Sequence, residues 1–185
     1  RLTTGGGFQD QVNGLVGGLK MVSSEPSQAP LLLSVEQLNI DPSLREQLNG
    51  SLLLAFTGKT RLAKNILQNV LRRWSKRTPE IVETVAQLVA GAKSSRDAIL
   101  VGDLDALGTC MTAYWEQKKI MAGDQSSGAE PAVVRDVLSV LHDKKLIRGA
   151  SMCGAGGGGF MAVLTAPGVS SKDLQATLQQ ELADQ

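Results

Sequence analysis

The sequence is poor in the residues that often mark a functional class. Only 3% of the 185 residues are aromatic, so the core must consist mainly of Leu, Val, Ile, Ala and Met. Its two cysteines, Cys110 and Cys153, are far apart, which excludes a disulfide framework and favours a reducing compartment such as the cytoplasm. The single histidine, His142, has no Cys or acidic partner at ligand spacing, so we predict no metal site in the protein itself.

Long apolar runs and an excess of charge are also missing. No run approaches the roughly 18 residues that a membrane-spanning helix needs. The formal net charge of +1 predicts no general attraction to nucleic acid or to a membrane. A hydrophobic content of 42% over this length suffices for one domain or two small lobes.

Three consecutive glycines near the start lead into a lone carboxylate. Gly5, Gly6 and Gly7 precede Phe8-Gln9-Asp10-Gln11, and a short helix is predicted to follow. Glycine lets other groups approach the backbone closely, and a carboxylate in a first helical turn is stabilised as an anion. Asp10 is therefore a candidate to orient a hydroxyl group or to accept its proton. The segment alone is explained as well, and more simply, by Asp10 as a helix cap.

A second glycine-rich segment, residues 153–160, lies near the other end of the chain. It contains the pattern G-x-G-x-x-G at Gly154, Gly156 and Gly159. A dinucleotide-binding fingerprint requires a helix after these glycines, but an apolar, strand-like run begins at Phe160. We therefore predict a loop between two strands, whose backbone can approach phosphate groups or another loop.

The periodicity of the remaining segments predicts an α+β fold in which strands come first, then a block of helices, then a strand pair and a last helix. The expected strands are 19–23, 31–38, 52–56, 146–152 and 160–165, of which 52–56 reads as buried on both faces. The expected helices begin near Gln11, Asp41, Thr60, Pro79, Arg96, Pro131 and Ser170. The pair Ser94-Ser95 is expected to cap a long helix from about Arg96 to Lys119, whose apolar face is interrupted near Gly102.

The turn after the strand 52–56 partly imitates a phosphate-binding loop. Gly58-Lys59-Thr60 matches the end of that motif, but Leu53 stands where its first glycine belongs, so the motif fails. Lys59 and Thr60 can still face an anionic ligand at a helix N-terminus, and a solvated turn explains them equally well.

Taken together, the two glycine segments resemble the second and third motifs of the GHMP small-molecule kinases, over essentially the whole chain. Within that family, Gln9-Asp10-Gln11 and residues 56–67 are most similar to the L-fucokinases, and next to the heptose-phosphate kinases. The resemblance implies a two-lobe fold. Residues 1–49 would be the C-terminal remainder of an upstream catalytic lobe, and residues 50–185 a ferredoxin-like C-terminal lobe with extra helices.

The resemblance also implies a function, namely transfer of a phosphoryl group from ATP, with Mg²⁺, to the anomeric hydroxyl of L-fucose. The product would be L-fucose 1-phosphate, on the way to GDP-fucose. Asp10 would be the catalytic residue. The other implied contacts are Gly6, Gly7 and Gln11 for the sugar, and Gly154, Ala155, Gly156, Gly157, Gly158, Lys59 and Thr60 for ATP.

The family's first motif, a phosphate loop with Gly-Leu-Gly-Ser-Ser, is not present in the sequence. We expect it upstream of Arg1, together with some of the Mg²⁺ ligands, so the chain would be the C-terminal part of a longer kinase and inactive alone. The upstream part of the same polypeptide is thus its expected partner.

Three alternatives remain open at this stage. One is another sugar kinase of the family, such as a heptose-phosphate kinase. The second is a ligand-sensing module that keeps the kinase scaffold, for which a carboxylate at Asp10 has no purpose. The third is a nucleic-acid-binding module that uses Arg72, Arg73, Lys76 and Arg77. It is the weakest, since the net charge is small and no row of aromatic residues accompanies the cluster.

Overall fold

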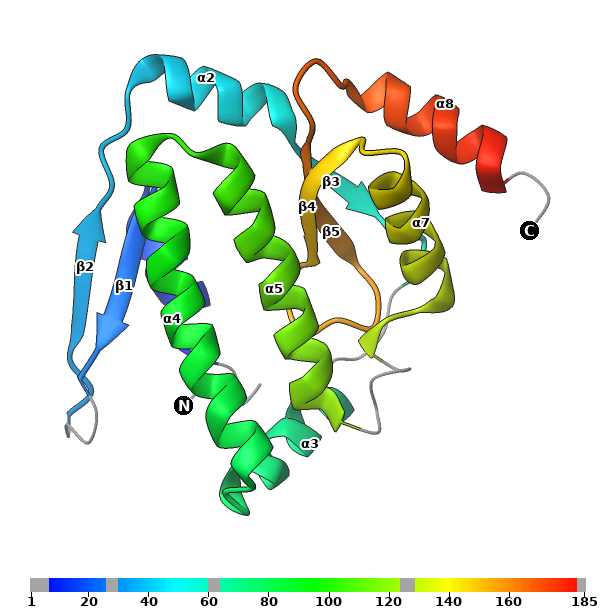
Figure 1. Cartoon of the computed structure of the whole chain (residues 1–185). Helices are drawn as coiled ribbons and strands as arrows, with labels where there is room; N and C mark the ends of the chain where they lie inside the picture. The colour runs from blue at the N-terminus through cyan, green and yellow to red at the C-terminus, as the bar shows by residue number, and fades with distance from the viewer. Residues whose placement is uncertain (1–6, 26–29, 60–63, 124–128, 183–185) are drawn as a thin grey trace.

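The computed structural model describes residues 7–25, 30–59, 64–123 and 129–182 (Figure 1). Helices and antiparallel strands combine in an α+β arrangement, which confirms the predicted fold class. In chain order the elements are α1 Gln9–Leu15, β1 Lys20–Ser24, β2 Leu33–Gln37, α2 Pro42–Ser51, β3 Leu52–Phe56, α3 Lys64–Ser75, α4 Pro79–Val101, α5 Leu104–Ala122, α7 Ala132–Asp143, β4 Ile147–Met152, β5 Phe160–Thr165 and α8 Ser171–Leu182.

The main sheet is antiparallel, has the strand order β3-β5-β4, and lies between two groups of helices (Figure 1). One core joins β4 and β5 to α7 and α8 and includes Val134, Leu141, Val163 and Leu174. Leu164 of β5 points the other way and packs with apolar residues of α2 and α5. The central strand is therefore buried on both faces, as its continuous apolar sequence requires.

The prediction that strand 52–56 is buried on both faces is wrong. Leu53 and Ala55 of β3 pack against the core, but Leu54 and Phe56 on the opposite face are 68% and 55% exposed. β3 is an edge strand, and α5 packs on β4 at the other side of the sheet. An apolar run alone does not show which strand of a sheet will be covered.

The predicted helix boundary at Ser94-Ser95 is also wrong, because α4 continues through both serines to Val101. Ser95 donates its hydroxyl hydrogen to the carbonyl of Gly91, which lets a serine sit inside a helix. The chain breaks instead at Gly102, which has a left-handed φ of 75°, and at Asp103. Asp103 caps α5 by accepting a hydrogen bond from the N–H of Ala106 (2.8 Å).

Other boundaries shift by less. α2 runs to Ser51 rather than Leu48, so the expected lobe boundary at residues 49 and 50 falls inside its last turn. β2 begins at Leu33 rather than Leu31. The predicted start of a helix at Thr60 lies outside the described residues, in which α3 begins at Lys64.

Strands β1 and β2 form a separate antiparallel hairpin beside α4 (Figure 1). Arg96 of α4 ties the hairpin to the helical part, since its Nε donates to a carboxylate oxygen of Glu36 in β2 (2.8 Å). Every residue of β2 is exposed. This ion pair anchors the hairpin to α4, and β2 presents an open surface.

α5 lies unusually close to β4, because two glycines face each other there. A Cβ on Gly149 of β4 would lie 1.9 Å from the carbonyl oxygen of Gly108 in α5. A Cβ on Gly108 would lie 2.6 Å from the backbone of Arg148. Backbone therefore packs directly on backbone, near the start of the strand whose other end leads into the second glycine segment. Among the helices described, none is long and apolar enough to cross a bilayer.

Candidate functional site

The second glycine segment forms the turn of a β-hairpin. β4 and β5 pair antiparallel up to Met152 and Met161, and the N–H of Cys153 donates to the carbonyl of Phe160 (2.8 Å). A strand follows the glycines, as predicted, so the segment is not a dinucleotide-binding fingerprint. We call residues 153–159 the glycine loop.

The backbone of the glycine loop has a conformation that side chains rarely allow. Five of its residues, Gly154, Gly156, Gly157, Gly158 and Gly159, have positive φ angles between 68° and 140°. Two of them also lack space for a side chain. A Cβ on Gly156 would lie 2.9 Å from the carbonyl oxygen of Ala129, and one on Gly158 would lie 2.6 Å from that of Lys59. The loop therefore needs glycine for its shape and for its contacts.

The turn after β3 braces the loop. The N–H of Gly159 donates to the carbonyl of Lys59 (2.7 Å), and the N–H and hydroxyl of Thr57 both donate to the carbonyl of Gly159 (2.9 and 3.0 Å). Two segments a hundred residues apart thus form one unit, and the backbone of Lys59 lies against the loop. Thr60 lies outside the described residues.

Some N–H groups of the loop remain open. Gly157 donates to the carbonyl of Ala129 (2.6 Å), and Gly159 donates to Lys59. Within the described part of the chain, the N–H groups of Gly154, Ala155, Gly156 and Gly158 have no protein partner. Backbone N–H groups gathered in a turn with positive φ angles bind anions, because their dipoles converge on one point.

A cleft of about 380 Å³ opens beside the start of the loop, between α4 and α5. Its lining is largely apolar, with polar groups from Ser95, Tyr114, Gln117 and Ser151 and the thiols of Cys110 and Cys153. Burial raises the pKa of Tyr114, and the nearby Cys153 raises it further. The ammonium group of Lys118 lies 5.1 Å from the centre of the Tyr114 ring, and burial lowers the pKa of Lys118.

Sequence reasoning missed this cleft. Its polar residues lie on two helices and come together only because α4 and α5 pack side by side. The one available signal was weak, in that Tyr114 is the only tyrosine of the chain and interrupts an apolar helix face.

Asp10 lies in the first turn of α1, where its side chain is exposed. Phe8 occupies the capping position, so Asp10 is not the helix cap that the simpler interpretation made it. No hydrogen bond among the described residues joins α1 to the glycine loop. The structure thus brings Lys59 and the loop together without linking them directly to Asp10.

The predicted sugar contacts surround Asp10 in sequence. Gly5 and Gly6 lie outside the described residues, and Gly7 is exposed. With its amide nitrogen turned toward the backbone, Gln11 donates to the carbonyls of Gly7 (3.0 Å) and Phe8 (3.2 Å). Gln11 therefore holds the turn that precedes Asp10.

The basic cluster at the end of α3 is partly used within the protein. Arg73 donates to the carbonyl of Met121 at the end of α5 (2.9 Å) and pairs with Glu80. The guanidinium of Arg77 stacks over the ring of Trp74 at 4.4 Å. These contacts occupy Arg73 and stack Arg77 on its neighbour, whereas Arg72 and Lys76 are exposed, as in a solvated helix end. Within the described ranges, no three His, Cys, Asp or Glu side chains come together as a metal site.

Comparisons with known proteins point to one family. Residues 95–184 match the family model described as GHMP kinases C terminal. The chain is 32% identical over 179 residues to the bifunctional fucokinase/GDP-fucose pyrophosphorylase of Arabidopsis thaliana, covering 96% of this chain and 16% of that protein. It is 30% identical over 181 residues to the L-fucokinase/L-fucose-1-P guanylyltransferase of Bacteroides fragilis, covering 96% of this chain and 17% of that protein. The chain thus spans about a sixth of the length of these relatives.

The fold has a counterpart among solved structures. The crystal structure of L. major mevalonate kinase in complex with R-mevalonate superposes with a TM-score of 0.60 at 16% identity. The match covers 89% of this chain and 45% of that chain. At this identity the likeness concerns the fold alone.

Proposed function

We propose that the chain is part of an ATP-dependent sugar kinase that acts on L-fucose, since residues 95–184 match the family model of the GHMP kinase C-terminal domain. The two relatives of about 30% identity over nearly the whole chain are both named for fucokinase activity. In the proposed reaction the anomeric oxygen of the sugar attacks the γ-phosphorus of ATP. The bond to the β-phosphate oxygen breaks, ADP leaves, and L-fucose 1-phosphate forms.

The observation that carries the proposal is the glycine loop. Four of its N–H groups, on Gly154, Ala155, Gly156 and Gly158, have no partner among the residues that the structure describes, and they suit the oxygen atoms of a nucleotide phosphate. The hydrogen bonds to Lys59 and Ala129 hold the loop in this form before any ligand arrives. Such preorganised N–H groups stabilise the charge that develops on a transferring phosphoryl group, without reorganisation at the moment of reaction.

The remaining roles follow from position and chemistry. Lys59, in the turn that braces the loop, would add a cation beside the phosphates, and Thr60, the next residue in the sequence, would add a hydroxyl. Gly157 contributes through its backbone shape, because its own N–H is bonded to Ala129. Mg²⁺ would neutralise charge on the ATP phosphates, and in the proposed enzyme its ligands come partly from outside this chain.

Asp10 is the proposed catalytic carboxylate. It would orient the anomeric hydroxyl or take its proton as the new O–P bond forms, which is worth on the order of 10²- to 10⁴-fold in rate. Its exposed side chain makes no hydrogen bond within the described residues and so is available to a substrate. Gly6 and Gly7 would let the chain pass close to the sugar, with Gln11 shaping that turn.

The cleft between α4 and α5 supplies candidate contacts for the other sugar hydroxyls. Tyr114 and Gln117 of α5 and Ser95 of α4 line it next to Gly154. Hydroxyl and amide groups are suited to the hydroxyls of a neutral sugar, because each can donate and accept.

We further propose that residues 1–49 complete a lobe formed mainly by upstream polypeptide, and that residues 50–185 form the C-terminal lobe. The exposed hairpin and the open face of β3 support this division, since both carry large apolar side chains; the most exposed are Leu31, Leu32, Leu54 and Phe56. The relatives, about six times as long as this chain, have polypeptide to cover such surfaces. Two free thiols, one of them exposed, fit a reducing cytoplasm.

The test is ADP release by the full-length protein with ATP, Mg²⁺ and a panel of acceptors: L-fucose, D-galactose, D-arabinose, a heptose 7-phosphate and mevalonate. We expect turnover on L-fucose that falls at least 100-fold in Asp10→Asn. Asp136→Asn, at a half-buried surface carboxylate on α7, is the matched control and should leave the rate unchanged.

Each other result has a defined meaning. Turnover on another acceptor would keep the kinase and replace the sugar. ATP binding without turnover on any acceptor would favour a ligand-sensing module. Full activity in Asp10→Asn would remove Asp10 from the mechanism.

A further inference from the structure

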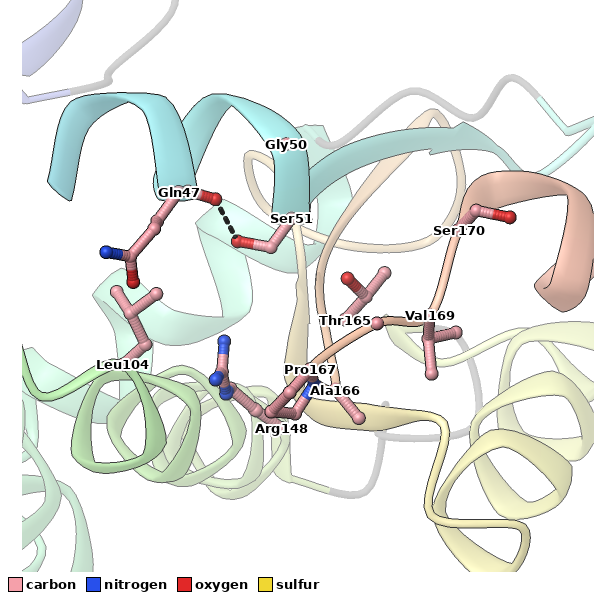
Figure 2. Close-up of a pocket in the computed structure, with 11 residues that line it drawn as sticks. Gln47, Gly50, Ser51, Leu104, Arg148, Thr165, Ala166, Pro167, Val169 and Ser170 are labelled. Atoms are coloured by element: carbon pink, nitrogen blue, oxygen red, sulfur yellow. Dashed lines mark hydrogen bonds between the residues drawn. The ribbon is translucent and has the colours of Figure 1, made fainter. Parts of the chain in front are cut away.

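A second cleft, of about 450 Å³, lies at the other end of the sheet from the glycine loop. The end of α2, the start of α5, the start of β4 and the connection from β5 to α8 surround it (Figure 2). β5 runs from the glycine loop at Phe160 to this cleft at Thr165, five steps of about 3.3 Å, so roughly 16 Å separate the two. A ligand here would not be the ATP held by the loop.

Arg148 is the one cation in this cleft. Its side chain is only 15% exposed, and its Nε donates to a carboxylate oxygen of Asp105 (2.7 Å). Its two terminal nitrogens have no partner among the residues that the structure describes. Figure 2 shows the guanidinium group in the space bounded by Leu104, Gln47 and Ser51. The side chain as a whole is largely buried, whereas its terminal nitrogens are open to the cleft, so a ligand that supplies acceptors can reach them. A guanidinium edge suits the paired oxygens of an oxyanion.

The other polar groups of the cleft suit hydroxyls rather than charges. The hydroxyl of Ser51 donates to the carbonyl of Gln47 (2.6 Å), which leaves its oxygen as an acceptor. The side-chain amide of Gln47 makes no hydrogen bond within the described residues. The hydroxyl of Ser170 donates to Asp173 (2.6 Å) and accepts from the N–H of Asp173 (3.3 Å), which leaves one oxygen lone pair as an acceptor.

Neither nearby carboxylate competes for the terminal nitrogens of Arg148. Asp105 already bonds Nε, and its side chain is 80% exposed to solvent. Asp173 faces its own helix start, where it accepts hydrogen bonds from the N–H and hydroxyl of Ser170. These bonds lower the pKa of Asp173, so its charge stays with the cap of α8.

We propose that this cleft is a second ligand site, for a sugar phosphate. The phosphate would bind the terminal nitrogens of Arg148, and the sugar hydroxyls would bind Gln47, Ser51 and Ser170. The volume lies in the range of small-molecule sites, about 300–1,000 Å³. The choice of L-fucose 1-phosphate as the probe rests on the function proposed above, whereas the site itself rests on Arg148 and its surroundings.

The experiment is calorimetric titration of the full-length protein with L-fucose 1-phosphate, L-fucose and inorganic phosphate. We expect the sugar phosphate to occupy two sites, and the second site to bind it at least tenfold more weakly in Arg148→Gln. Arg148→Lys should restore only part of the affinity, because an ammonium group lacks the planar fork. Inorganic phosphate should bind this site more weakly than the sugar phosphate, and L-fucose more weakly still.

Two controls separate binding from folding. Arg135→Gln, at an exposed arginine on α7, should leave both sites unchanged. Asp105→Asn weakens the same ion pair but keeps the guanidinium, so it should retain the second site. A single binding site in the wild type, or unchanged binding in Arg148→Gln, would overturn the proposal.

The result is independent of the test for kinase activity. Asp10→Asn should abolish turnover and keep the site at Arg148. Absence of turnover on every acceptor, with phosphate binding that depends on Arg148, would refute the proposed function and leave this inference standing.

Discussion

Replacing Gly149 with alanine should loosen the contact between α5 and β4 that the glycine loop depends on. The new Cβ would lie 1.9 Å from the carbonyl oxygen of Gly108, 2.5 Å from its carbonyl carbon and 2.8 Å from its Cα. All three atoms are helix backbone, so no side chain can rotate away. The helix has to move as a body.

The size of that movement follows from the distances. An ordinary contact is 3.4 Å or more, so the nearest pair must separate by about 1.5 Å. Overpacking of a core usually costs about 1–3 kcal/mol. Since the clash here is between two backbones and moves all of α5, we expect a loss of about 3 kcal/mol or more. Part of that loss comes from Trp115, a buried residue of the same helix.

Urea unfolding measured by far-ultraviolet circular dichroism would test this value. Gly91→Ala is the matched control, because Gly91 lies inside α4 with open space around its Cβ position. It should stabilise the protein by about 0.5–1 kcal/mol, the usual gain for alanine over glycine in a helix. Gly108→Ala should resemble Gly149→Ala, and the double variant should cost less than the sum, since one displacement relieves both clashes. Stability in Gly149→Ala within about 0.5 kcal/mol of wild type would refute the reasoning.

Three further changes test other parts of the structure. Gly158→Ala places a Cβ 2.6 Å from the carbonyl oxygen of Lys59, so the KM for ATP in steady-state assays should rise at least tenfold. Gly154→Ala is the control, because its Cβ would have no atom within 4 Å, and its effect on the KM should be smaller. Trp115→Phe removes the hydrogen bond to Glu130 (2.7 Å) and leaves a largely buried carboxylate short of a donor, which should cost about 1–3 kcal/mol in urea unfolding. The Ser43 hydrogen bonds lower the pKa of Asp41 from 3.8, so its stabilising effect is present above pH 3.8 and is lost as the pH falls further. Asp41→Asn lacks this contribution, so it should be less stable than the wild type above pH 3.8 and should have its acid-unfolding midpoint at a higher pH.

Local chemistry made much of the fold predictable. The paired strands around the glycine loop were predicted within a residue of their observed bounds, because turn residues and apolar runs define a hairpin by themselves. α8 and α7 were predicted equally well from their caps and their apolar spacing. In these segments the signal and the structure both arise from neighbours in sequence.

The predictions were wrong where contacts between residues far apart in the sequence determine the structure. The Ser94-Ser95 pair looks like a cap, but α4 packs against α5 along its length, and Ser95 is satisfied by the carbonyl of Gly91. The signal at Gly102-Asp103 was present and stronger, since a left-handed glycine followed by an acidic cap ends one helix and starts the next. The exposure of Leu54 and Phe56 depends on the strand order, which no local pattern contains.

The same distinction holds for the candidate site. The glycine loop was predicted from its composition, but its brace at Lys59 comes from a turn a hundred residues earlier and became visible only with β3 paired to β5. Arg148, the centre of the second cleft, carries no motif. It becomes a candidate ligand contact only because four separate elements form a cleft around it.

The sheet gives these two sites a physical relation. β4 carries Arg148 near its start and continues into the glycine loop at its end, with the glycine contact to α5 between them. The backbone contact between Gly108 and Gly149 has no side chain that could repack. A shift of β4 along α5 would therefore move the whole strand, including its end at the glycine loop. A ligand on Arg148 that favoured one position of β4 would thereby change the energy of the loop at the far end. The coupling would show as a change in ATP affinity on adding sugar phosphate, present in the wild type and absent in Arg148→Gln.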